Sequence, residues 1–222
     1  MYLARTVAPT GSILTLAEAK AQLRIPFDDE DTLIAGYIAL AAEDLEGFSQ
    51  ANGHMEGGYL GRALLTQTLE LRLDEFPPFP APTASRFNGG YYPTFGMAAP
   101  IVLPMPPLQS VTSIKYLDGT RTLQTMDPAT YIGETATLQG RIVLPQGQAW
   151  PTDVALEPHA VRITYVAGYG ADASALPIGI KQAAKLLVGM YYNYREAGMD
   201  TKAQGFGLAF NSLLSRHRIP GF

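Results

Sequence analysis

The sequence predicts an α+β fold, with helices at both ends of the chain and short strands between them. Apolar residues recur at helical spacing up to Phe48 and again from Leu176. From Leu64 the pattern alternates instead, and turn residues then separate six or seven short apolar runs up to Val166. The chain has 222 residues, enough to bury a substantial core in one large domain or two small ones.

The composition is that of a globular protein with rather few charges. Apolar residues make up 47% of the chain and charged residues 16%. No apolar run approaches the ~18 residues of a membrane span, and the N-terminus lacks the apolar core of a signal peptide. The absence of cysteine excludes disulfides, thiolate metal sites and cysteine nucleophiles. Folding without oxidation suits synthesis in a cytoplasm.

Charge is distributed unevenly along the chain. Residues 1–60 hold three basic and nine acidic residues, a net charge of −6, whereas the whole chain carries −4 and the remainder therefore +2. The basic footprint of a nucleic-acid-binding protein is absent. We expect any DNA near this protein not to be gripped tightly through its phosphates.

Two helices are predicted near the N-terminus. Thr15 and Glu18 match a capping box, in which each side chain hydrogen-bonds the backbone N–H of the other, and a short helix should follow to about Arg24. Acidic residues at 28–31 suit the electropositive start of a second helix, over residues 29–48. Because their spacing is not that of a calcium loop, helix capping is preferred over a cation site.

The middle of the chain predicts short strands around a long loop. A half-buried strand is expected over residues 65–73, and six prolines then exclude a helix or central strand over residues 76–100. The aromatic residues of that loop either bury against a neighbour or belong to a mobile excursion. A hairpin is predicted at Asp118 and Gly119, and the last strand at residues 160–166. Further short strands are expected at residues 101–103, 130–133 and 141–144.

The most distinctive helix is predicted from Leu176 to Ala197. Pro177 suits its first turn, and Gly198 follows at its end. Its apolar arc spans roughly 200°, wider than the ~100° stripe of a one-sided helix. This helix should therefore be packed from more than one direction, and part of the packing could come from another subunit. A final helix is expected over residues 207–216.

No catalytic, cofactor-binding or metal-binding set emerges, so an enzyme and a bound cofactor are not expected. A G-x-G-x-x-A motif runs from Gly168 to Ala173, but Pro177 starts the next helix several residues too late for a dinucleotide-binding turn. We interpret the motif as a strand-to-helix loop. The three histidines are scattered and lack companion ligands.

The order of segments resembles the head–tail connector (adaptor or head-completion) proteins of long-tailed double-stranded DNA bacteriophages and gene transfer agents. No single one of the matching segments is specific to this family, but the occurrence of so many of them in the same order is. They are LTLAEAK at 14–20, GRAL at 61–64, PPLQSV at 106–111, Asp127-Pro128 with Tyr131, GRI at 140–142, Trp150-Pro151, VAGYG at 166–170, Pro177, KQA at 181–183, Tyr191-Tyr192 and Arg195-Glu196.

This resemblance implies a small helical bundle, residues 1–62 and 168–222, interrupted by an antiparallel β-rich domain at residues 63–167. It implies a structural virion protein at the head–tail junction (neck), made in the host bacterial cytoplasm. About twelve copies would form a closed ring. The implied partners are the portal at the capsid vertex, a stopper or tail-completion protein, and double-stranded DNA that passes through the channel without specific binding, with no membrane involved.

Three sets of residues are hypothesised to act in this assembly. Acidic residues of the second helix would line the channel, a basic and apolar tail would dock on the portal, and apolar residues of the long C-terminal helix would pack between subunits. The sets are Glu43, Asp44 and Glu46 for the channel, Arg216, Arg218, Ile219 and Phe222 for the portal, and Leu187, Tyr191 and Tyr194 for subunit packing.

Two other classes of function are alternatives. One is a β-rich module that binds protein or carbohydrate through the aromatic loop at 76–100. The less favoured one is a nucleotide-binding enzyme that uses the loop from Gly168 to Ala173.

Overall fold

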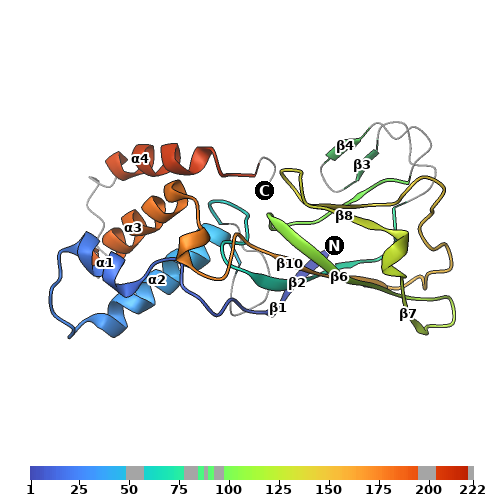
Figure 1. The fold of residues 1–222 in the computed structure, drawn as a ribbon, viewed down its shortest axis with the longest axis horizontal. Coiled ribbons are helices and arrows are strands. Elements are labelled where there is room, and N and C mark those ends of the chain that lie inside the picture. Colours follow the sequence, from blue (N-terminus) through green and yellow to red (C-terminus); the bar gives the residue numbers. More distant parts are fainter. Residues whose placement is uncertain (49–57, 78–84, 88–89, 93–97, 195–203, 220–222) are drawn as a thin grey trace. The chain divides into compact units, whose positions relative to one another are not determined.

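The computed structural model of the protein describes residues 1–48, 58–77, 85–87, 90–92, 98–194 and 204–219. The chain divides into two compact units (Figure 1). The helical unit comprises Pro9–Thr66 and Tyr169–Pro220, and the β unit comprises Met1–Ala8 and Gln67–Gly168. The α+β class predicted from the sequence is confirmed.

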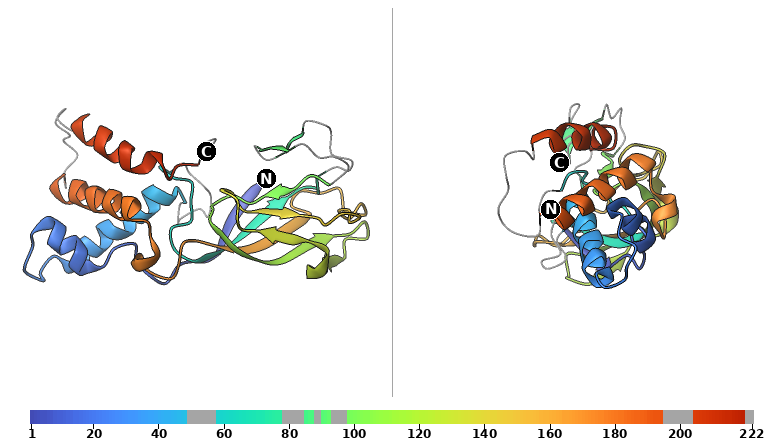
Figure 2. Two further views of the ribbon diagram at one scale, coloured as in Figure 1. Left: turned by 45° about the horizontal axis from the view of Figure 1, so that its top comes forward. Right: turned by 90° about the vertical axis from the view of Figure 1, so that its left-hand side faces the viewer.

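The helical unit holds the four described α-helices: α1 (Leu16–Leu23), α2 (Asp31–Glu46), α3 (Ile178–Asn193) and α4 (Gln204–Ser215). Helix α3 contacts each of the other three, and the right-hand view of Figure 2 looks onto this group. Its core is aliphatic, with Ile34, Ile38 and Leu45 of α2 packed in one cluster with Ile180 and Leu187 of α3. The apolar arc of α3 is thus largely covered within its own chain.

Local signals set the ends of the N-terminal helices. Helix α1 starts at the predicted capping box and ends at Arg24, whose left-handed backbone (φ 60°) returns its N–H to the last turn. Helix α2 begins at Asp31, later than predicted, because the N–H of Asp31 bonds the carbonyl of Asp28 in a separate turn, 3.1 Å away. It ends at Gly47, which is also left-handed (φ 77°).

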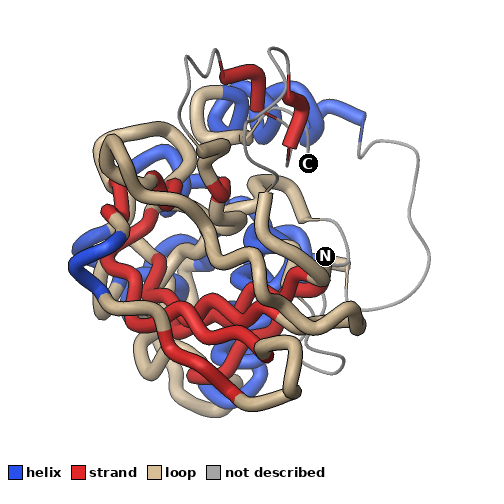
Figure 3. Tube along the Cα trace, turned by 90° about the vertical axis from the view of Figure 1, so that its right-hand side faces the viewer, coloured by secondary structure: helices blue, strands red, loops and turns tan. Residues whose placement is uncertain are grey.

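An antiparallel five-stranded sheet forms the centre of the β unit, in the order β1-β2-β10-β6-β7 (strands red in Figure 3). A second sheet has the order β5-β9-β8, and β3 and β4 pair with each other inside the segment 76–100. The strands are β1 (Tyr2–Val7), β2 (Gln67–Leu73), β3 (Ser85–Phe87), β4 (Gly90–Tyr92), β5 (Ile101–Val102), β6 (Leu108–Leu117), β7 (Leu123–Thr125), β8 (Ile132–Glu134), β9 (Arg141–Val143) and β10 (Val161–Ala167).

Alternating burial organises the core of the β unit. Every second residue of β2 and β10 is buried, as the period of a half-buried strand requires. Tyr165 of β10 is fully buried, and its hydroxyl donates to the carbonyl of Pro104, 2.8 Å away. Trp150, predicted as a core anchor, is buried, stacks on Phe76 with ring centroids 5.1 Å apart, and donates its Nε1–H to the carbonyl of Ala99.

Strand β1 is a difference from the prediction, which placed residues 1–62 entirely in the helical part. Tyr2–Val7 pairs with β2 at the edge of the five-stranded sheet, with an irregular register between Arg5 and Val7. The partner strand lies some sixty residues away, so no local turn signal announces this pairing. The hairpin of β6 and β7 is confirmed, and the carboxylate of Asp118 accepts hydrogen bonds from the N–H groups of Thr120 and Thr122 in its turn.

Candidate assembly surfaces

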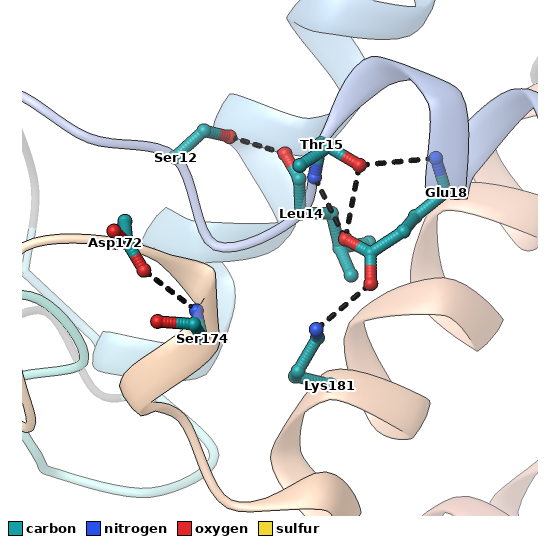
Figure 4. Close-up of polar contacts among 7 residues, drawn as sticks. All are labelled: Ser12, Leu14, Thr15, Glu18, Asp172, Ser174 and Lys181. Atoms are coloured by element: carbon teal, nitrogen blue, oxygen red, sulfur yellow. Dashed lines mark hydrogen bonds and ion pairs between the residues drawn. The ribbon is translucent and has the colours of Figure 1, made fainter.

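A polar contact ties the start of α1 to α3 (Figure 4). The carboxylate of Glu18 accepts from the N–H of Thr15 at 3.0 Å and from Lys181 Nζ at 2.8 Å, while Thr15 Oγ1 accepts from the N–H of Glu18 at 3.1 Å. The hydrogen bond from Lys181, followed by that from the Thr15 backbone, lowers the pKa of Glu18 from 4.5 to about 2. The capping box therefore also serves as a tertiary link.

Two tyrosines at the end of α3 form hydrogen bonds with one acidic residue of α2 and one that directly precedes it. The hydroxyl of Tyr191 donates to the carboxylate of Asp44, and that of Tyr192 donates to Glu30. Burial and the bond to Asp44 raise the pKa of Tyr191 well above its usual range, so this hydroxyl stays a donor at any physiological pH. These acids and tyrosines form part of the internal structure of the helical unit.

One face of α2 is exposed and almost free of charge, a feature that the sequence prediction did not single out. We call it the α2 outer face, and it consists of Thr32, Leu33, Ala35, Gly36, Ala39 and Leu40. No charged residue lies between Asp31 and Glu43. The signal in the sequence was this eleven-residue stretch without charge, because an ordinary solvated helix face carries charged and polar side chains.

The G-x-G-x-x-A motif forms a strand-to-helix loop, as predicted. Strand β10 ends at Ala167, a 3-10 turn capped by Asp172 follows, and α3 starts only at Ile178. Ser174 donates its N–H to the Asp172 carboxylate at 2.8 Å, so the cap of this turn is filled by its own chain. The start of α3 therefore lies too late for a dinucleotide turn.

Within the described ranges, no cluster of three or more His, Asp or Glu side chains could hold a metal ion. In the same ranges, no helix is long and apolar enough to cross a membrane.

Residues 13–72 match the family model described as "Phage gp6-like head-tail connector protein". Over these residues the chain is similar to the head–tail connector family. The matched residues include α1, α2 and most of β2, and the family is one of structural connectors rather than enzymes. The resemblance predicted from the sequence is thereby confirmed, as is the expectation that the chain is not an enzyme.

Solved structures of gene transfer agent (GTA) particles share the connector fold over its full length. The chain is 24% identical to a protein in the "Neck of empty GTA particle computed with C6 symmetry", with a TM-score of 0.71 and coverage of 100% of this chain and 99% of that one. Identity and coverage are the same for the "Virion of native gene transfer agent (GTA) particle" and the "Neck of native GTA particle computed with C12 symmetry", with TM-scores of 0.69 and 0.68. At this identity, the likeness establishes the fold. No curated protein matches the sequence.

The residues of the predicted channel set do not share one environment. Glu43 and Asp44 are partly exposed, and Asp44 is held by Tyr191. Glu46 is only 4% exposed, and its carboxylate accepts the N–H of Leu64 at 2.8 Å. Because this carboxylate is buried inside its own subunit, we withdraw Glu46 from the channel set.

The predicted portal-docking set is also divided. Arg216 and Arg218 are exposed at the end of α4, and Arg218 Nε donates to the carbonyl of Tyr59 at 3.0 Å. Ile219 is 1% exposed and its N–H bonds the carbonyl of Leu60, so it anchors the chain and cannot be a free docking residue. Phe222 lies outside the described residues.

The predicted subunit-packing set is covered mainly from within. Leu187 is 1% exposed in the core of the helical unit, so it offers no surface to another copy and its assignment is corrected. Tyr191 is half-buried against α2. Tyr194 is 44% exposed and stays available. The wide arc of α3 is explained by α1, α2 and α4, which all pack on it.

Proposed function

We propose that this protein is the subunit of an adaptor ring that joins the portal at the capsid vertex to the tail or stopper. The observation that carries the proposal is the likeness to the neck protein of a gene transfer agent, which leaves almost no part of either chain unmatched. A subunit of the same size and topology can occupy the same kind of place. The family match over residues 13–72 supports the proposal independently.

A ring of about twelve copies with cyclic symmetry fits this role. The relatives belong to necks computed with C6 and C12 symmetry. In the proposed ring, the helical bundle and the inserted β-rich domain (residues 63–167) would be repeated around a central channel. The protein would reside at the head–tail junction of the virion after synthesis in the host bacterial cytoplasm.

The charge of the chain suits a conduit for DNA. At a net charge of −4, it has no excess of cations to hold phosphates. Glu43 and Asp44 are proposed to face the channel, where a weakly acidic wall would let DNA pass without being retained. The experiment is cryo-electron microscopy of particles that carry this protein, with density for the chain expected between portal and tail. Particles with no such density would overturn the proposal and favour the β-rich binding module.

Arg216 and Arg218 are the residues proposed to contact the portal. Because Ile219 is buried, removing residues 216–222 would disturb the fold, so the sharper variant is R216A combined with R218A. The matched control is R121A, which removes an exposed arginine (side chain 77% exposed) from the β unit. We expect the double variant to fold normally and lose portal capture, and the control to keep both. Capture by the double variant at the wild-type level would refute the assignment.

A further inference from the structure

The α2 outer face carries large apolar side chains that the described part of the chain leaves partly exposed. Leu33 and Leu40 are 38% and 42% exposed, although the helix they belong to packs its opposite side into the core through Ile34, Ile38 and Leu45. The two leucines lie seven residues apart, which puts them on one side of the helix two turns apart. Gly36 lies between the two leucines, one turn from each, and Ala39 flanks it on the exposed side, so the surface around Gly36 is mostly apolar.

Gly36 lies in the middle of this face, and the described residues show no crowding that would require a glycine there. A Cβ atom added to Gly36 would meet nothing within 4 Å, and its φ is not in the left-handed region. Glycine inside a helix costs about 1 kcal/mol relative to alanine. Neither crowding nor backbone conformation in the subunit compensates for this cost. A compensating gain would arise if another backbone approached the helix closely at Gly36.

Another glycine of the bundle shows what an open site looks like on a solvated face. Gly189 of α3 also has nothing within 4 Å of an added Cβ. Its neighbours one turn away are Lys185, Leu186, Tyr192 and Asn193, and the Asn193 amide donates to the Gly189 carbonyl. A cation and an amide thus border Gly189, whereas Gly36 is bordered by Thr32, Leu33, Ala39 and Leu40 and by no charge. Gly189 therefore serves as a matched control.

The charge distribution indicates what covers the face. Residues 1–60, which include α2, carry −6, and the remainder of the chain carries +2. Subunits in a ring of more than two copies meet through two different surfaces, one from each neighbour. Such a contact would set the acidic surroundings of α2 against the net basic part of the next chain. A second copy of this chain is therefore electrostatically suited to the face, whereas DNA is not.

We infer that the α2 outer face is a subunit–subunit contact of the assembled ring, with the next copy packed closely over Gly36. This inference rests on the proposed function, since it names the partner of a surface in that ring. In the isolated subunit the face is exposed to water. In the ring, Leu33 and Leu40 would be buried on either side of a close backbone approach.

The first experiment compares G36Q with G189Q in the full chain. Both variants should melt no lower than wild type by circular dichroism, since each replaces an open helical glycine with a better helix former. We expect G36Q to be lost from particles and G189Q to be incorporated like wild type. Equal incorporation of a folded G36Q would overturn the inference while leaving the proposed function intact.

A second experiment identifies the occupant. The photo-crosslinker p-benzoyl-phenylalanine replaces Leu40, particles are irradiated, and the products are separated by mass. A product of two copies of the 23.9-kDa chain is expected. A product with any other protein, or with DNA, would overturn the assignment to a second copy. Wild-type protein missing from the particles would overturn the proposed function, and this inference with it.

Accessibility provides a third readout, because the chain has no native cysteine and G36C or G189C would be its single thiol. Assembly should slow the reaction of G36C with a maleimide about tenfold or more, as burial in a closely packed interface core requires. G189C should react at similar rates in the free subunit and in particles. A G36C thiol that reacts equally fast in both states would contradict the inference.

Discussion

Replacing Glu18 by alanine is expected to destabilise the helical unit by about 1–1.5 kcal/mol. The substitution removes the return hydrogen bond of the capping box, at about 0.5–1 kcal/mol, and the ion pair with Lys181, at about 0.5 kcal/mol. Both contacts are well formed, at 3.0 Å and 2.8 Å. For a chain of this length, the melting temperature should fall by about 2–5 °C.

E18Q separates the two contributions. Glutamine can still accept the hydrogen bond from the Thr15 N–H, so E18Q should lose only the ion pair. Its melting temperature should therefore be about 1–2 °C below that of wild type. K181M should cost a similar amount, and the double variant E18Q/K181M should show a coupling of about 0.5 kcal/mol. The assay is urea unfolding followed by circular dichroism at 222 nm, because the described α-helices all lie in the helical unit.

The same pair predicts a pH dependence. The pKa of Glu18 is lowered from 4.5 to about 2 in the folded protein, so its contribution is present above pH 4.5 and lost as the pH falls toward 2. The stability difference between wild type and E18Q should therefore shrink over this window. E18Q as unstable as E18A, a coupling of zero, or a difference independent of pH would refute the reasoning.

Substitutions at four further positions test other parts of the structure. E46A should cost about 1–3 kcal/mol in urea unfolding, because it leaves the buried N–H of Leu64 without its acceptor, and E46Q should retain most of the stability. G36A and G189A should each raise the stability of the isolated subunit by up to about 1 kcal/mol in thermal melts. A G36A variant less stable than wild type would contradict the open space found around Gly36. Y165F should cost about 1 kcal/mol in urea unfolding, since a buried loop carbonyl loses its donor, and an unchanged midpoint would contradict that bond.

Local signals in the sequence were sufficient for several elements. The capping box at Thr15 predicted the start of α1, Pro177 predicted the start of α3 to within two residues, and Asp118 predicted the hairpin of β6 and β7. Each of these signals acts within a few residues of the feature that it predicts. The class of fold followed from the period of the apolar residues, which is helical at both ends of the chain and alternating between them.

Features that depend on distant residues were not predictable in the same way. Glu46 resembles a surface acid by sequence, but the return of the chain at Leu64 buries it. Ile219 resembles part of a free tail, but the carbonyl of Leu60 fixes it. The wide arc of α3 indicated extra packing, yet only the positions of the other helices show that its own chain supplies that packing and that α2 has the uncovered face.

The interleaving of the two units has a consequence for synthesis in the cell. Strand β1 leaves the ribosome first, yet its partner β2 follows only after the whole segment Pro9–Thr66. Helices α1 and α2 likewise lack their packing partner α3 until the β unit has been synthesised, because α3 follows the last strand, β10, in the chain. A chain cut short before α3 therefore contains no finished helical unit and leaves the apolar residues of α2 exposed. Translation through α3 is thus required before the core of the helical unit can form.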